Sequence, residues 1–192
     1  MRLLLLHGLY GNEPEHWQTW LADRAAADGL GVLYPALPDA DAPTAPGWLA
    51  AVEPLLGSPD DLLVAAHSLG CHLWAHLATR QRRPLARRVV MVAPPGAPEV
   101  QAEIPTFRPA AWDGQALRRA CPDTAVVLGE SDAWLADPGP VRASGLPVHW
   151  VPGGAHLSVV AGYGPWPAVH AWLHGGPPPG QPAERRRPRP PV

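Results

Sequence analysis

The chain has 192 residues, which fits one domain because a single hydrophobic core usually stops growing only beyond about 250 residues. Hydrophobic residues make up 46% and charged residues 17%, so the chain can bury enough apolar surface to fold. The net charge of −2 and the lack of any run of about 18 apolar residues exclude a strongly basic nucleic-acid-binding protein and a membrane-spanning one. Two cysteines are too few for a disulfide framework, which indicates a reducing, cytoplasmic setting.

Short apolar runs alternate with helical patterns in the first third of the sequence. Leu3–Leu6 predicts a buried strand, because the apolar run stops at His7 and is shorter than the ~7–15-residue hydrophobic region of a signal peptide. Apolar spacing from Trp17 to Arg24 predicts a helix. A second strand is expected at Val32–Tyr34, followed by a loop rich in proline and aspartate and a helix around Gly47–Leu56.

The same alternation continues to residue 174. Asp61–Ala66 predicts a third strand that leads without a break into a helix carrying Leu73, Trp74, Leu77 and Ala78. Further strands are expected at Arg88–Ala93, Ala125–Leu128 and Pro147–Val151, with a less regular segment around Phe107, Trp112 and Leu117 and a closing helix at Trp166–His174. Apolar strands that alternate with amphipathic helices are typical of a mostly parallel, doubly wound sheet with helices on both faces.

The domain is therefore expected to span residues 1–174, leaving a short tail. Gly175–Val192 holds seven prolines and four arginines with almost nothing to bury, so this segment is predicted to be disordered.

The strongest chemical signal lies where the third strand meets its helix. Ala66-His67-Ser68-Leu69-Gly70 is a variant of the G-x-S-x-G nucleophile elbow with alanine in the first glycine position. Only small residues fit two positions before and after a serine in so sharp a turn, which leaves the hydroxyl of Ser68 exposed. The N–H of Leu69 would begin the helix without a helical acceptor, free to face an oxyanion. The structural alternative is an ordinary helix cap at Ser68.

A second motif follows the first strand. His7-Gly8-Leu9-Tyr10-Gly11 allows a tight turn at Gly8, and the next amide, Leu9, is the candidate second oxyanion donor. A glycine after a strand is common in any turn, so the motif gains its meaning from the elbow.

An acid and a base follow two later strands, in the chain order Ser, Asp, His that is typical of folds with a nucleophile elbow. Asp132 comes after Ala125–Leu128, and His156 comes after Pro147–Val151. His156 would take the proton of Ser68, and Asp132 would orient the imidazole. Singly, each residue could be an ordinary turn former. Glu130 is the chief rival for the acid and Asp137 a lesser one.

Other conspicuous side chains receive less weight. His72 and His76 lie four residues apart on a helix but lack an H-E-x-x-H pattern or a third ligand, so we expect no metal site. Most of the nine tryptophans occupy apolar helix positions and are predicted to lie in the core. The candidates to line a substrate pocket are His7, Tyr10, His67 and Trp134.

With these residues in place, the sequence resembles the retinoblastoma-binding-protein-9-like (YdeN-like) small serine hydrolases of the α/β-hydrolase superfamily. The shared landmarks are His7-Gly8, Trp17, Trp20, Trp48, His67-Ser68-Leu69-Gly70, Ala93-Pro94, Asp132, Gly154-Ala155-His156 and Gly164-Pro165-Trp166-Pro167. The resemblance covers about residues 1–174 and implies an α/β-hydrolase fold with no cap domain, a Ser68–Asp132–His156 triad and no cofactor. Ala133-Trp134 and Leu157-Ser158 depart from the family pattern, which leaves the pocket and its substrate open.

The expected function is hydrolysis of a small ester, thioester or activated amide through an acyl-Ser68 intermediate, with the amides of Leu9 and Leu69 holding the oxyanion. The expected partner is a small-molecule acyl substrate, with no nucleic acid and no membrane. Two alternatives stay open: a catalytically silent protein that uses this fold as a binding module, and an acyltransferase that uses the same triad.

Overall fold

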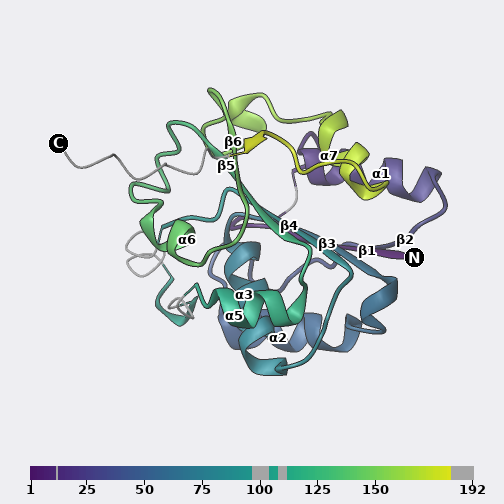
Figure 1. Cartoon of the computed structure of the whole chain (residues 1–192). Coiled ribbons are helices and arrows are strands. Elements are labelled where there is room, and N and C mark those ends of the chain that lie inside the picture. Colours follow the sequence, from purple (N-terminus) through teal and green to yellow (C-terminus); the bar gives the residue numbers. More distant parts are fainter. Residues whose placement is uncertain (12, 97–103, 108–111, 183–192) are drawn as a thin grey trace, which may run out of the picture.

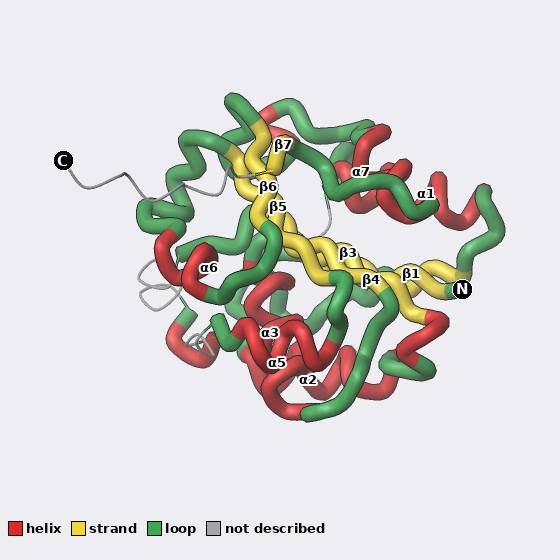
Figure 2. The backbone as a smooth tube through the Cα atoms, viewed as in Figure 1, coloured by secondary structure: helices red, strands yellow, loops and turns green. Residues whose placement is uncertain are grey.

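The computed structural model describes residues 1–11, 13–96, 104–107 and 112–182. In these ranges the strands form a seven-stranded sheet of order β2-β1-β3-β4-β5-β6-β7, which runs through the middle of the molecule (Figure 2). They are β1 (Arg2–Leu6), β2 (Gly31–Leu33), β3 (Leu62–His67), β4 (Arg88–Val92), β5 (Thr124–Gly129), β6 (Val148–Val151) and β7 (Gln181–Pro182). The strands from β2 to β6 pair in parallel and β7 is antiparallel to β6, which confirms the predicted mostly parallel sheet.

Helices cover both faces of the sheet. They are α1 (Trp17–Ala27), α2 (Ala45–Val52), α3 (Leu69–Gln81), α5 (Gly114–Ala120), α6 (Gly139–Ala143) and α7 (Pro167–Leu173), with short 3-10 helices at Glu53–Leu55, Pro59–Asp61, Pro105–Phe107 and Val159–Ala161. α1 and α7 lie on one face, and α2, α3 and α5 lie on the other (Figure 1). The prediction that helices lie on both faces of the sheet is therefore confirmed.

The continuous apolar runs follow from burial on both faces. In β1, Leu4 and Leu6 pack into the core beneath α2 and α3, whereas Leu3 and Leu5 pack into the core beneath α1 and α7. Successive side chains of a strand point to opposite faces, so a strand covered on both sides needs an apolar residue at every position. None of the helices in the described ranges has the length and hydropathy that crossing a membrane requires.

The end of the sheet where the parallel strands finish carries no inserted domain in the described part of the chain. The connection between β4 and α5 spans residues 93–113. A segment of that length is well below the ~40 residues that an independent folding unit usually needs. The expected absence of a cap domain agrees with this arrangement.

Within the described residues, the α-helices α5 and α6 were not predicted. The less regular segment around Leu117 contains α5, which Asp113 caps by accepting hydrogen bonds from the N–H groups of Gln115 and Ala116 at 2.9 and 3.0 Å. α6 holds only five residues. Both helices span two turns or fewer, so the 3.6-residue periodicity that reveals a helix in a sequence has too few repeats to be recognised.

The predicted disordered tail needs a correction. Residues 175–182 are described by the structure, and Gln181 pairs with Trp150 of β6. Arg88 holds the preceding segment by donating hydrogen bonds to the carbonyl groups of Trp172 and Gly176. The prediction considered only apolar side chains, whereas backbone hydrogen bonds order this segment. Residues 183–192 lie outside the described residues.

The start of α3 approaches the end of β1 so closely that only glycine fits at position 70. A Cβ atom on Gly70 would lie 2.8 Å from the carbonyl oxygen of His7 and closer still to that of Leu6. Both obstacles are backbone atoms, which cannot rotate away as a flexible side chain would.

We expect Gly70→Ala to lower the free energy of unfolding by about 3 kcal/mol, the upper part of the usual range for overpacking. Helix propensity alone would favour alanine by about 1 kcal/mol, so the predicted sign is opposite to that of an unconstrained helix. Urea unfolding followed by tryptophan fluorescence measures the change. Gly31→Ala is the control, because its Cβ would meet the flexible side chain of Arg2 at 3.3 Å and the carbonyl oxygen of Met1 only at 4.0 Å, and a change within about 0.5 kcal/mol is expected. A Gly70→Ala variant as stable as the parent would contradict this packing argument.

Candidate active site

The loops after three parallel strands bring Ser68, Asp132 and His156 together. Ser68 follows β3, Asp132 follows β5 and His156 follows β6. The carboxyl ends of parallel strands meet at the same edge of a sheet, so residues far apart in sequence converge there.

Ser68 occupies the sharp turn between β3 and α3. Its backbone has φ 51° and ψ −122°, a region that a residue with a side chain rarely adopts. The turn is fixed on both sides, because the N–H of Ser68 donates to the carbonyl of Val92 at 2.9 Å and its own carbonyl accepts from the N–H of Cys71 at 2.9 Å. The strained conformation carries the hydroxyl of Ser68 out of the sheet and into a cleft.

A chain of hydrogen bonds connects the three side chains. The Ser68 hydroxyl lies 2.9 Å from Nε2 of His156, and Nδ1 of His156 lies 2.9 and 3.1 Å from the two carboxylate oxygens of Asp132. The Asp132 side chain is only 2% exposed, and its Oδ1 also accepts the N–H of Trp134 at 2.9 Å. A carboxylate at Nδ1 favours the tautomer with the proton on that nitrogen, which leaves Nε2 free to accept the proton of Ser68.

The rival acids lie elsewhere. The side chain of Glu130 is exposed, and its backbone instead joins two loops by donating to Val151 and accepting from Ala155 at 3.0 and 2.9 Å. Asp137 is exposed and accepts the N–H of Gly139 at 2.8 Å. Asp132 is thus the one of the three candidate carboxylates that contacts His156 in this structure.

The loop after β1 closes over Ser68. A Cβ atom on Gly8 would lie 2.8 Å from Cβ and 3.2 Å from Oγ of Ser68, so glycine permits the approach. Leu9 follows at once, and both Leu9 and Leu69 line the same cleft as the Ser68 hydroxyl. Leu69 is the first residue of α3, where an N–H has no acceptor within the helix.

His7 does not line the cleft, contrary to expectation. Its ring is buried beneath the loop, where Nδ1–H donates to the carbonyl of Gly8 at 2.8 Å and Nε2 accepts the N–H of Leu37 at 3.2 Å. Burial lowers the pKa of His7, in keeping with a neutral ring that both donates and accepts. His7 therefore supports the loop from behind.

The cleft has a volume of about 190 Å³ and combines an apolar wall with a polar one. Tyr10, His67 and Trp134 line it. Tyr10 and Trp134 are 73% and 42% exposed, which places them at an open mouth. The other lining residues are Gly8, Leu9, Gly11, Glu13, His16, Gln18, Ser68, Leu69, Pro95, Ile104, His156 and Ser158.

His16 and Gln18 are among the lining residues that were not predicted from the sequence. His16 caps α1 by accepting the N–H of Gln18 at Nδ1, 3.2 Å away. Gln18 is fully buried and donates from Nε2 to the carbonyl groups of Leu6 and Ala65, while its Oε1 accepts no hydrogen bond from the described residues. A histidine before a helical pattern is a weak capping signal, and only the fold reveals that this helix begins beside the site.

Histidines around Ser68 are held neutral by burial. Nε2–H of His67 donates to the carbonyl of His156 at 3.0 Å, and burial holds the pKa of His67 well below its usual range. Burial and the neighbouring His156 lower the pKa of His16 to about 4. His72 donates from Nε2 to Pro95 at 3.0 Å, and burial lowers its pKa to about 4. Within the described residues, His72 and His76 belong to no three-ligand group.

These low pKa values predict a pH-dependent stability. An unfolded histidine is protonated below about pH 6.5, whereas folded His16 and His72 take up a proton only near pH 4. Between these values the unfolded chain binds more protons, so the free energy of unfolding falls as the pH is lowered through that window. Urea unfolding from pH 7 to pH 4 measures it. His16→Asn keeps a capping side chain and removes one titrating group, which should reduce the slope by up to about 1.4 kcal/mol per pH unit. An identical slope in the variant would refute this assignment.

Several solved structures have folds similar to this one. The ydeN gene product from B. subtilis has a TM-score of 0.78 and 21% identity, with 91% of this chain and 97% of that chain covered. A Pectobacterium atrosepticum protein described as a YdeN-like hydrolase has a TM-score of 0.71 and 19% identity, covering 91% and 89%. Est1E from Butyrivibrio proteoclasticus has a TM-score of 0.62 and 14% identity, covering 90% and 86%. A search of curated proteins gave no match.

At identities of 14–21%, the likeness to these solved structures establishes only the α/β-hydrolase fold. Membership of a family rests on a match of the sequence itself. The model described as Serine hydrolase matches residues 3–175, which include every residue of the hydrogen-bonded chain. The protein therefore belongs to the Serine hydrolase family, and its fold is similar to those of YdeN and a YdeN-like protein.

Proposed function

We propose that this protein hydrolyses a small ester, thioester or activated amide through an acyl-Ser68 intermediate. The observation that carries the proposal is the unbroken hydrogen-bond chain from Ser68 through His156 to Asp132, at a strained turn that opens into a cleft. Nucleophile, base and orienting acid are each within hydrogen-bond reach of the next, which is the arrangement that acyl transfer requires.

In the first step Oγ of Ser68 attacks the acyl carbon while Nε2 of His156 takes the hydroxyl proton. The tetrahedral intermediate collapses when His156 gives that proton to the leaving group, and the acyl group stays on Ser68. A water molecule then attacks the ester, its proton passes to His156, and the acid leaves as Oγ recovers a proton. Asp132 stabilises the imidazolium in both steps because its carboxylate is buried against Nδ1.

The amides of Leu9 and Leu69 are proposed to hold the oxyanion. Support comes from position: Leu69 begins α3, and Leu9 follows the glycine that approaches Ser68. Two N–H groups from different loops would stabilise charge that develops only in the transition state.

A small acyl group is proposed because of the shape of the site. The cleft is lined by Leu9, Leu69 and Ile104 on its apolar side and holds about 190 Å³. Pockets for drug-sized ligands are usually ~300–1,000 Å³, so a short acyl chain fits within the cleft and a long one would project past Tyr10 and Trp134.

Turnover of short p-nitrophenyl esters tests the nucleophile and base. Ser68→Ala and His156→Ala should each reduce kcat/KM by on the order of 10³-fold or more, because the residues act as a unit. Circular dichroism checks that both variants are folded. Ester turnover that survives in folded Ser68→Ala would contradict the proposal, and a parent protein inactive on all esters and thioesters would favour the binding-module alternative.

A pair of matched amide substitutions tests the acid. Asp132→Asn should lower kcat/KM by on the order of 10²–10⁴-fold, because an amide at Nδ1 no longer selects the required tautomer or stabilises the imidazolium. Glu130→Gln makes the same chemical change two residues away on an exposed side chain and should leave kcat/KM within about twofold of the parent. The reverse pattern would transfer the role to Glu130.

A further inference from the structure

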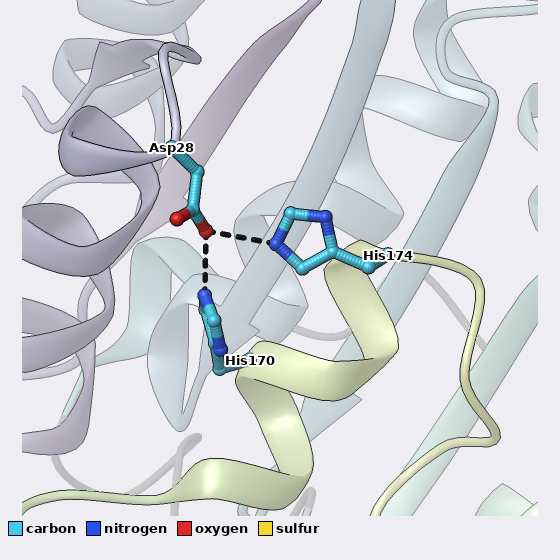
Figure 3. Close-up of side chains that lie close together, drawn as sticks. All are labelled: Asp28, His170 and His174. Atoms are coloured by element: carbon cyan, nitrogen blue, oxygen red, sulfur yellow. Dashed lines mark hydrogen bonds and ion pairs between the residues drawn. The ribbon is translucent and has the colours of Figure 1, made fainter.

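A group of three possible metal ligands lies away from the cleft, on the face of the sheet covered by α1 and α7. Asp28 is the C-terminal cap residue of α1 and follows Ala27 directly. His170 lies within α7, and His174 is the C-terminal cap residue that follows Leu173. Because His170 and His174 are four residues apart, their rings project from the same side of α7, and both point to Asp28 (Figure 3).

Both rings contact a single carboxylate oxygen. Nε2 of His170 lies 2.6 Å and Nε2 of His174 lies 2.8 Å from Oδ2 of Asp28. The three ligand atoms all lie within 4.8 Å of one another.

We propose that Asp28, His170 and His174 form a surface site for a divalent transition-metal ion of the Zn²⁺ class. Two imidazole nitrogens and one carboxylate oxygen are ligands that such ions prefer, and water completes a coordination shell with three protein ligands. The inference does not rest on the proposed hydrolysis.

The geometry requires only a small adjustment. Ligands about 2.0–2.1 Å from a tetrahedral Zn²⁺ are about 3.3 Å from each other, so Nε2 of His170 must move about 0.7 Å and Nε2 of His174 about 0.5 Å away from Oδ2. The side chains of Asp28, His170 and His174 are 34%, 25% and 48% exposed, which leaves them room to move. To bind the ion, Nε2 of each ring needs a free lone pair. In a neutral ring the proton therefore moves from Nε2 to Nδ1 by exchange with solvent, and a protonated ring must release one proton.

An ion here would connect α1 to α7 far from Ser68. α1 starts beside the cleft at His16 and ends at Asp28. Its 11 residues span about 16 Å at the usual helical rise, so the site lies roughly that far from the cleft. No metal site was expected from the sequence. Spacing within one helix can relate His170 to His174, but the third ligand, Asp28, comes from another helix.

Isothermal titration of the untagged full-length protein with ZnCl₂ tests the proposal. The parent should bind one Zn²⁺ per chain at this site, and His170→Ala, His174→Ala and Asp28→Asn should each weaken that binding at least about tenfold, since even outer-shell changes cost that much. His156→Ala is the matched control for the histidines around the cleft and should bind Zn²⁺ as the parent does.

Thermal unfolding provides an independent measurement. ZnCl₂ should raise the melting temperature of the parent and of His156→Ala, and should not raise that of His174→Ala. Circular dichroism confirms that the surface variants are folded before titration. No binding by the parent, equal binding by all variants, or binding lost only in His156→Ala would overturn the proposal. None of these results depends on whether Ser68 is active.

Discussion

The close approach of two strand-end loops is the constraint on which the rest of the site depends. Gly8 touches Ser68, and Gly70 touches the backbone at the end of β1, so β1, β3 and α3 can come together only if both positions lack a side chain. Because the loop after β1 lies against Ser68, the amide of Leu9 and the hydroxyl of Ser68 share one cleft. His7, buried below, ties this loop to the segment after β2. The chemistry proposed for the site therefore depends on backbone packing as much as on reactive side chains.

α1 extends from the cleft to the group formed by Asp28, His170 and His174. His16 and Gln18 at its start form part of the polar wall, and Asp28 at its end meets the two histidines of α7. Trp17, the first residue of α1, is fully buried. Its ring nitrogen donates a hydrogen bond to the carbonyl of Leu157, the residue after His156, at 3.1 Å. Trp17 thus helps to hold the histidine loop in place, and an ion at the far end of α1 would add a link between α1 and α7.

Much of the fold could be predicted because its signals are local. The apolar strands and the small residues around Ser68 each reveal their structure within a few positions, and the order of parallel strands explains why Asp132 and His156 meet Ser68 in one hydrogen-bonded chain. Features that depend on partners distant in sequence were missed. Residues 175–182 are held by the Arg88 side chain, which donates to the Gly176 carbonyl, and by pairing with β6, and the positions of His7, His16 and Gln18 depend on how loops pack. α5 was missed for a different reason, since it is too short for periodicity to reveal.

The central claim is that Ser68 is an activated nucleophile, and covalent labelling by a fluorophosphonate tests it most directly. Such a probe reacts with a serine hydroxyl whose proton a neighbouring base can remove. The account predicts one adduct on the intact parent protein by mass spectrometry, located on Ser68 by peptide mapping, and no adduct on Ser68→Ala. A folded parent protein that stays unlabelled, or an adduct on another residue, would contradict it.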